Sequence, residues 1–295
     1  MSVQVYIPKF SGFCPGVKFA ETELFREKEK NPDIPIYVLG DLIHNSRYIQ
    51  YLEKHAIHTV ESISEIPEKA TVAIRTHGIN RDTEKKLRDR FKVIDLTCWK
   101  VKKLQKIIAE YAEQGHYVLI TGKEKHPEVQ GLISYAEQFR VISTEEQLNS
   151  DVADGAPVRM EIEQRQVKKI LCVSQTTGSR DLFDTAVKRI KELFSDNFDI
   201  AVIDSICSIT SNREEEAISY LEKTDMAYVV GDKMSSNANK LYKRLKKIHE
   251  QTYFVQGVED VKSINPDSLQ AVLLVSSSST PDFVEKDIRK YLETL

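Results

Sequence analysis

Apolar runs with strand character alternate with amphipathic helical stretches along the whole chain. Three of these runs, residues 3–7, 93–95 and 201–204, each lead through a few residues to a cysteine, and a helical pattern follows each cysteine. Strands that alternate with helices are typical of parallel α/β units, because two parallel strands need a long crossover connection that is usually helical. The pattern therefore predicts an α/β fold.

Three of the four cysteines occupy corresponding places in this pattern. They are Cys14, Cys98 and Cys207. A thiol in a strand-to-helix turn, near a helix N-terminus, ionises readily to the thiolate, which is the form that binds metals. We therefore expect the three thiols to meet and to hold one metal centre. Cys172 lies inside the apolar run Ile170-Leu171-Cys172-Val173 and is predicted to be a buried core residue.

The same order of elements recurs after each of the three cysteines. A helix is followed by a strand that ends in glycine, a second helix, two more strands and an amphipathic helix that leads to the next cysteine. The third unit ends without a strand and cysteine of its own, and the N-terminal residues supply both. The repeat predicts three α/β units around a pseudo-threefold axis: residues 14–97, residues 98–206, and residues 207–295 completed by strand 1–13. Residues 149–166 are an insertion in the second unit and are predicted to form a surface hairpin or loop.

Polar side chains follow the predicted strands at corresponding positions. They are His44, His77, His126, Ser235, Ser236, Asn237 and Ser279. Ligands of open α/β sheets bind beyond the carboxyl ends of the strands, and these side chains can donate hydrogen bonds to phosphate oxygens. Because the chain has no P-loop, we expect a small phosphorylated ligand rather than a nucleotide. Glu128 lies beside His126 and is a candidate proton donor. The alternative is three ordinary domains whose strand ends carry unrelated turn residues.

Composition restricts the classes of function. The chain has 295 residues and a formal net charge of −3, which argues against a general nucleic-acid-binding protein. No apolar run approaches the roughly 18 residues that a membrane-spanning helix needs, and the first residues lack the features of a secretory signal. We therefore expect a cytoplasmic protein with no nucleic-acid or membrane partner. In such a protein, four cysteines favour a metal or redox role over disulfides.

The residues alone leave the metal open. Three thiolates suit either zinc or an iron–sulfur cluster, and the absence of a CxxC pair gives no guidance. A zinc site with three cysteines and one histidine is the simpler alternative. In a cubane cluster, three-cysteine ligation leaves one iron without a protein ligand, and that iron could bind an oxygen of the substrate.

The motifs that carry these residues resemble those of the IspH/LytB family of 4-hydroxy-3-methylbut-2-enyl diphosphate reductases. The similar motifs extend from Phe13-Cys14-Pro15-Gly16-Val17 to Ser279-Thr280-Pro281-Asp282, over nearly the whole chain. The most specific are His44-Asn45, Thr76-His77-Gly78, Asp95-Leu96-Thr97-Cys98, His126-Pro127-Glu128-Val129-Gln130-Gly131, Ser174-Gln175-Thr176-Thr177, Thr210-Ser211-Asn212-Arg213 and Ser235-Ser236-Asn237-Ala238-Asn239.

The resemblance implies a trefoil of three α/β domains around a [4Fe-4S] cluster bound by the three cysteines. It also implies reductive removal of the substrate's hydroxyl, with two electrons and two protons, to give isopentenyl and dimethylallyl diphosphates. The seven polar residues at the strand ends would bind the diphosphate. Glu128 would relay protons, and Thr176 would help to orient the reacting hydroxyl. A small partner such as ferredoxin or flavodoxin would supply the electrons.

Three places depart from the usual family pattern: the run Ser276-Ser277-Ser278 before Ser279, the segment Cys207-Ser208-Ile209, and the position after the second cysteine. The family commonly has proline after its second cysteine, whereas this chain has Trp99, its only tryptophan. This difference leaves open a second hypothesis, in which the same cluster scaffold acts on a different small phosphorylated substrate. A third hypothesis is a non-catalytic protein that senses redox state or binds a ligand. All the residues predicted for diphosphate binding and proton relay are present.

Overall fold

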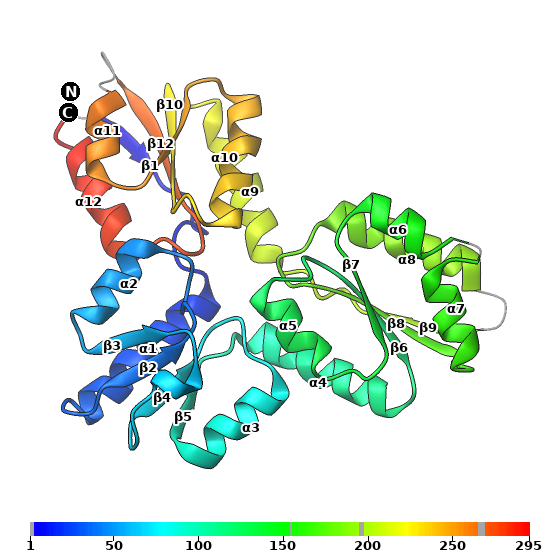
Figure 1. Cartoon of the computed structure of the whole chain (residues 1–295). Coiled ribbons are helices and arrows are strands. Elements are labelled where there is room, and N and C mark those ends of the chain that lie inside the picture. Colours follow the sequence, from blue (N-terminus) through cyan, green and yellow to red (C-terminus); the bar gives the residue numbers. More distant parts are fainter. Residues whose placement is uncertain (1–2, 154, 195–197, 265–268) are drawn as a thin grey trace. The chain divides into compact units, whose positions relative to one another are not determined.

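The computed structural model describes residues 3–153, 155–194, 198–264 and 269–295, and for Ser236 the backbone only (Figure 1). These residues form three four-stranded sheets with helices between the strands, so the predicted α/β class is confirmed. The chain divides into two compact units, Met1–Thr76 with Ser208–Leu295, and His77–Cys207. Among the described residues, no helix combines the length and the apolar character that crossing a membrane requires.

Sheet A has the strand order β1-β12-β10-β11, and its pairings are parallel. Its strands are β1 (Gln4–Tyr6), β10 (Met226–Val230), β11 (Thr252–Val255) and β12 (Ala271–Ser276). The helices that follow its strands or precede them are α9 (Ser208–Leu221), α10 (Ser236–Ile248), α11 (Val258–Ile264) and α12 (Asp282–Leu292). Tyr228 of β10 belongs to the same apolar cluster as Val284 of α12. The next residue, Val229, belongs to the cluster of Leu221 on α9. Since β10 is buried on both faces, its sequence is continuously apolar.

Sheet B has the strand order β3-β2-β4-β5, with β2 parallel to both β3 and β4. Its strands are β2 (Ile36–Leu39), β3 (Ile57–Val60), β4 (Thr71–Ile74) and β5 (Lys92–Asp95). The helices of this part of the sequence are α1 (Pro15–Lys30), α2 (Ser46–Glu53), the short 3₁₀ helix η1 (Ile63–Glu65) and α3 (Arg81–Arg90). Leu24 of α1 and Leu52 of α2 are fully buried, as are Ile36 and Val38 of β2.

Sheet C has the strand order β7-β6-β8-β9, again parallel. Its strands are β6 (Tyr117–Thr121), β7 (Phe139–Ile142), β8 (Lys169–Ser174) and β9 (Asp199–Val202). Its helices are α4 (Trp99–Glu113), α5 (Pro127–Ile133), α6 (Glu145–Asp151), α7 (Pro157–Gln164) and α8 (Arg180–Phe194). Cys172 of β8 packs in the apolar core against α8 and is fully buried, which confirms its predicted structural role.

The prediction of a hairpin or loop at residues 149–166 is wrong. Most of this segment is helical, because α6 extends to Asp151 and α7 begins at Pro157. Val158 and Ile162 lie one helical turn apart and are fully buried in the core of sheet C. Proline is favoured at a first helical position, where its missing N–H costs nothing. The high polarity of the segment reflects the solvent-facing side of an amphipathic helix.

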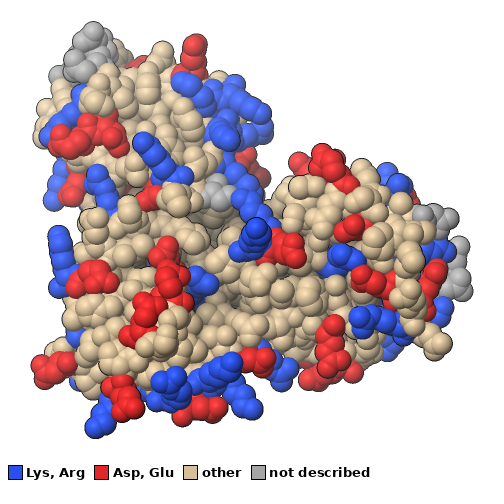
Figure 2. All heavy atoms as spheres, in the orientation of Figure 1, with Lys and Arg blue, Asp and Glu red and all other residues tan. Residues whose placement is uncertain are grey.

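The three sheets draw their strands from separate stretches of the sequence. Sheets B and C use strands from residues 36–95 and 117–202, and sheet A joins the N-terminal strand β1 to strands from residues 226–276. The domain boundaries stay a prediction. On the face drawn in Figure 2, acidic and basic side chains are interspersed, and basic side chains gather over α10, whose sequence contains no acidic residue.

Candidate active site

The three cysteines that the repeat singles out lie at the starts of helices. Cys14 and Cys98 are the N-cap residues of α1 and α4, and Cys207 directly precedes α9. All four cysteines lie in the described chain and are thiols, and these three are partly exposed. In contrast, burial raises the pKa of the Cys172 thiol to about 12. The donor set therefore fits a metal centre bound by three thiolates, from which Cys172 is excluded.

Two of the cysteine turns share one local structure. Asp95, three residues before Cys98, accepts a hydrogen bond at Oδ1 from the backbone N–H of Thr97, 3.0 Å away. Asp204, three residues before Cys207, accepts one at Oδ1 from the backbone N–H of Ile206, 3.1 Å away. Such a bond to the second following residue fixes a turn of the backbone. Each aspartate therefore shapes the turn that presents its cysteine.

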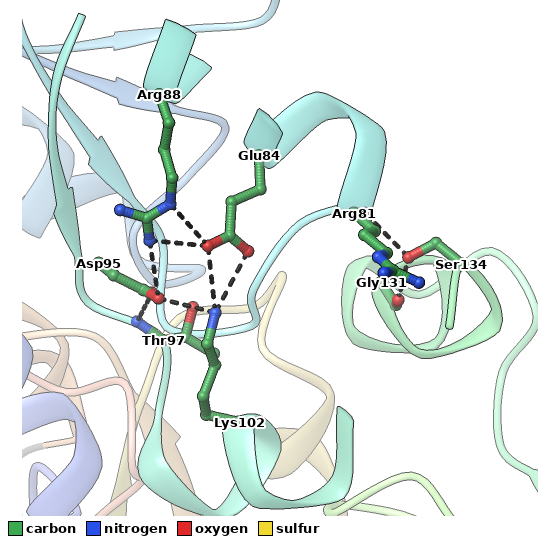
Figure 3. A network of polar contacts seen from close by, with 8 residues as sticks. All are labelled: Arg81, Glu84, Arg88, Asp95, Thr97, Lys102, Gly131 and Ser134. Atoms are coloured by element: carbon green, nitrogen blue, oxygen red, sulfur yellow. Dashed lines mark hydrogen bonds and ion pairs between the residues drawn. The ribbon is translucent and has the colours of Figure 1, made fainter. Parts of the chain in front are cut away.

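A network of ion pairs supports the turn before Cys98 (Figure 3). Lys102 Nζ lies 2.8 Å from an oxygen of Asp95 and 3.2 Å from an oxygen of Glu84, which also pairs with Arg88 at 2.7 Å. Burial raises the pKa of Asp95, but the hydrogen bonds from Lys102 and Thr97 outweigh it, so the pKa lies below its ordinary value. The ionised carboxylate is thus the form that the folded chain stabilises.

Replacing Asp95 with Asn is expected to lower the free energy of unfolding by about 1–2 kcal/mol, because a charge-assisted bond is lost from a partly buried site. The lowered pKa means that this contribution is present above the ordinary value of 3.8 and is lost as the pH falls below it. Chemical denaturation at pH 7 and pH 3 measures both effects. Asp204→Asn is the matched control, since its partner Arg180 is 47% exposed. A loss in Asp95→Asn no larger than in this control would contradict the expectation.

Glu128 is a buried carboxyl group at the start of α5. Its side chain is only 2% exposed, although the residue is ionisable. Thr176, the second residue after β8, donates to Glu128 twice, from its backbone N–H to Oε1 at 2.6 Å and from its Oγ1 hydroxyl to Oε2 at 2.9 Å. Burial raises the pKa of Glu128 to about 7, and the two bonds from Thr176 oppose that rise. A carboxyl group with this pKa can both give and take a proton near neutral pH.

Two of the predicted histidines, His77 and His126, lie in the same unit as Glu128 and close to the start of α5. His126 caps α5, and its Nδ1 accepts a hydrogen bond from the backbone N–H of Glu128, 3.1 Å away. The rings of His77 and His126 meet edge to face, with centroids 5.3 Å apart. The fold therefore places His77, His126, Glu128 and Thr176 in one cluster.

Close packing of α5 explains how His77 and His126 come together. A Cβ at Gly131 would lie 3.2 Å from the carbonyl oxygen of Ile79, so only glycine fits there without displacement. Ser134 Oγ donates to the Gly131 carbonyl at 2.6 Å and accepts from the backbone N–H of Arg81 at 2.9 Å (Figure 3). These contacts hold α5 against the segment that follows His77.

The other unit contains most of the predicted hydroxyl and amide groups. Ser235 caps α10, and its Oγ accepts a hydrogen bond from the Ser279 hydroxyl, 3.1 Å away. Ser277 Oγ in turn contacts Ser279 Oγ at 3.2 Å. Asn237 lies partly exposed in the first turn of α10, while the side chain of Ser236 lies outside the description. The ends of β10 and β12 therefore form one hydroxyl cluster.

Asp232 links this hydroxyl cluster to the segment that carries His44. Its Oδ2 accepts from the backbone N–H and the hydroxyl of Ser46, at 2.9 and 2.8 Å. Burial raises the pKa of Asp232, but hydrogen bonds from Ser46 and Met234 outweigh it, and the pKa lies below its ordinary value. His44 Nδ1 lies 3.6 Å from a carboxylate oxygen of Asp41. Asp232 thus holds the loops after β2 and β10 together.

The sequence pattern did not identify Asp95, Asp204 or Asp232 as functional. The signal for the first two was present, because an aspartate stands three residues before both Cys98 and Cys207. Asp232 offered no such signal, since it acts on Ser46, which is far away in the sequence. Trp99, whose effect the sequence left open, is 61% exposed at the first position of α4.

Parallel α/β sheets, thiols at helix starts and a buried carboxyl group of raised pKa together define an α/β enzyme with a candidate metal centre. Comparison with known proteins gives the particular family. The family model described as LytB protein matches residues 5–293, and the chain belongs to this family. The membership predicted from the motifs is confirmed. The family uses an iron–sulfur cluster.

Several relatives and solved structures are similar over nearly the whole chain. The 4-hydroxy-3-methylbut-2-enyl diphosphate reductase of Clostridioides difficile is 31% identical over 99% of this chain and 100% of that protein. The enzyme of the same name from Petrotoga mobilis is 32% identical over 99% of this chain and 97% of that protein. A solved structure of (E)-4-hydroxy-3-methyl-but-2-enyl diphosphate reductase, the terminal enzyme of the non-mevalonate pathway, has 28% identity and a TM-score of 0.77 over 99% of this chain and 100% of that chain. The E-1-hydroxy-2-methyl-but-2-enyl-4-diphosphate reductase of Plasmodium falciparum has 25% identity and a TM-score of 0.80 over 100% of this chain and 88% of that chain.

Proposed function

We propose that this chain is a 4-hydroxy-3-methylbut-2-enyl diphosphate reductase. The reaction replaces the hydroxyl group of the substrate with hydrogen, consumes two electrons and two protons, releases water and gives isopentenyl and dimethylallyl diphosphates. Membership of the LytB family and full-length similarity to enzymes of this name support the proposal. The structural observation that carries it is the buried carboxyl group of Glu128, whose pKa is raised to about 7 and whose two oxygens are both bonded by Thr176.

Cys14, Cys98 and Cys207 are proposed to bind a [4Fe-4S] cluster. Their partial exposure at the starts of α1, α4 and α9 supports this assignment, because helix N-termini favour the thiolate. A bound cluster would supply the two electrons and a Lewis acid for the departing hydroxyl group. The electrons are proposed to come from a small partner such as ferredoxin or flavodoxin.

Glu128 is proposed to deliver protons to the substrate. At pH 7 a carboxyl group with a pKa of about 7 is half protonated, so it can donate a proton and be recharged from solvent. The hydroxyl of Thr176 contacts Oε2 of Glu128 and is proposed to orient the reacting hydroxyl group at that carboxyl. Both residues are buried, which limits the access of competing water.

The diphosphate is proposed to bind the polar side chains at the strand ends. These are His44, His77, His126, Ser235, Ser236, Asn237 and Ser279. Ser235 and Ser279 already share a hydrogen bond, and the loop of His44 is tied to the loop of Ser235 through Asp232. Because Ser235, Ser279 and the loop of His44 are ordered by contacts of their own, little conformational entropy of these groups is lost when the ligand binds.

The test of this function is anaerobic reconstitution followed by turnover. We expect a brown protein with about four irons per chain, from the chemistry of cubane clusters. It should convert 4-hydroxy-3-methylbut-2-enyl diphosphate when a reduced viologen supplies electrons. A colourless protein with one tightly held zinc would contradict the cluster. Full cluster occupancy without product would favour the hypothesis of a different small phosphorylated substrate.

Replacing Thr176 with Val is expected to lower turnover about tenfold, because the hydroxyl proposed to orient the reacting group is lost while the backbone N–H that binds Glu128 remains. The hydrogen bond from the same hydroxyl lowers the pKa of Glu128, so removing the hydroxyl should raise that pKa above its present value of about 7. The dependence of kcat on pH measures the shift, and Thr176→Ser, which retains the hydroxyl, is the control. A midpoint that moves to lower pH would contradict this role.

A further inference from the structure

Helix α9 directs two charged side chains at the segment that leads to Cys14. Arg213 and Glu216 are three positions apart and therefore lie on the same side of the helix. Arg213 is only 3% exposed, which is rare for a side chain that is always charged. Such a side chain is stable in the interior only when its donors are satisfied.

The contacts of these two side chains are with backbone groups. Arg213 donates from Nε to the carbonyl oxygen of Phe10 and from Nη2 to that of Gly12, the latter at 2.7 Å. Glu216 accepts from the backbone N–H groups of Lys9 and Phe10, at 2.8 and 3.1 Å. The two residues thus form a clamp, here the α9 clamp, on four backbone groups of residues 9–12.

The α9 clamp also reaches the loop that carries Ser279. Arg213 donates from Nη1 to the hydroxyl of Ser278, the neighbour of Ser279. The backbone N–H of Gly12 donates to the carbonyl oxygen of Ser276 at 3.0 Å, and the N–H of Ser276 donates to Ser11 Oγ at 2.8 Å. The segment before Cys14 and the loop after β12 are therefore held as one assembly, with Arg213 between them.

The first cysteine turn needs this external support. Asp95 and Asp204 stand three residues before Cys98 and Cys207 and fix those turns locally. The corresponding residue before Cys14 is Ser11, whose hydroxyl bonds to β12 and to α12 instead of its own turn. The turn of Cys14 is thus shaped by contacts with residues more than 200 positions away.

We propose that Arg213 and Glu216 are positioning residues that hold the Cys14 thiol for the iron–sulfur cluster and the Ser279 hydroxyl for the diphosphate. This inference rests on the proposed function. The planar guanidinium is suited to the task, because its fixed fork of donors can bind two carbonyl oxygens and a hydroxyl at once, which an ammonium group does not reproduce. Helix α9 begins directly after Cys207, which is one proposed cluster ligand. The same helix fixes the loop that leads to Cys14, which is another.

The test compares Arg213→Gln with the parent and with Arg244→Gln. Arg244 of α10 is a matched control. It donates to Glu214, which lies in α9 like Arg213, at 2.9 Å, and its side chain is 56% exposed. In Arg213→Gln we expect iron to be lost to a chelator about tenfold faster under anaerobic conditions, as for other residues that orient metal ligands. The KM for the diphosphate substrate should rise severalfold. The electron paramagnetic resonance spectrum of the reduced cluster should broaden. Arg213→Lys should restore the rate of iron loss, the KM and the spectrum only in part.

If Arg213→Gln does not fold, Glu216→Gln tests the same clamp, because it retains the size of the side chain and weakens its two bonds; faster iron loss is again expected. Iron loss, cluster spectrum and KM equal to those of Arg244→Gln would overturn the proposal, while the turnover of the parent still upheld the proposed function. A parent chain that assembles no cluster would overturn both.

Discussion

Replacing Glu128 with Gln is expected to lower turnover by about 10²–10⁴-fold, the usual contribution of a positioned acid–base group. The amide has nearly the same shape and keeps an oxygen that can accept from the backbone N–H of Thr176, so the fold and the cluster should persist. It carries no proton that it can deliver. Steady-state turnover with a reduced viologen, measured together with the iron content, separates loss of chemistry from loss of cofactor.

The pH dependence gives this prediction a second readout. Because the pKa of Glu128 is about 7, kcat of the parent should fall as the pH rises through 7, and Glu128→Gln should lose this limb of the profile. The free energy of unfolding should also fall as the pH rises. A raised pKa means that the stability associated with the neutral carboxyl is fully present below its ordinary value of 4.5 and is lost as the pH rises through about 7. Glu128→Gln should lack this loss.

Glu124→Gln is the matched control for the Glu128 variant. Glu124 lies in the loop between β6 and α5 and is exposed, so removing its charge should leave turnover within about twofold, as for surface changes in general. A Glu128→Gln enzyme that turns over at the parent's rate would remove the proton-relay role and would favour a redox-sensing or binding protein.

Replacing any one of Cys14, Cys98 and Cys207 with Ser is expected to abolish stable cluster assembly and to reduce activity by about 100-fold or more, because a hydroxyl is a poor ligand for iron compared with a thiolate. Iron and sulfide counts after anaerobic reconstitution measure the assembly. Thermal unfolding of the metal-free proteins should be nearly unchanged, since the three thiols are partly exposed and outside the apolar cores.

Cys172→Ala is the control for the cysteine series. It removes a buried sulfur from the core of sheet C, so it should lower stability by about 1 kcal/mol and leave the iron content as in the parent. The assignment of the ligands would fail if Cys172→Ala lost the cluster while one of the other three variants retained it fully.

The residues that the sequence marked most clearly were those that recur. Three cysteines in the same place of a repeated pattern predicted helix-start thiols, and two of them are N-cap residues while the third directly precedes its helix. The pattern failed where local composition misled it. The polar segment from Asn149 to Gln166 contains α7, because Val158 and Ile162 are buried against a core that local polarity does not reveal.

The succession of strands and helices along the chain, the parallel α/β class, the place of each cysteine and the family itself were determined by the sequence, since they depend on periodicity and on motifs of a few adjacent residues. The tertiary structure alone decided that Glu128 is buried with a pKa of about 7 and bonded by Thr176, and that α9 clamps the turn of Cys14. The physical reason is that burial and hydrogen bonding between distant residues depend on how the elements pack. A carboxyl or guanidinium group has the same composition in solvent and in a core, and only its neighbours in space set the charge of the carboxyl group and the role of either group.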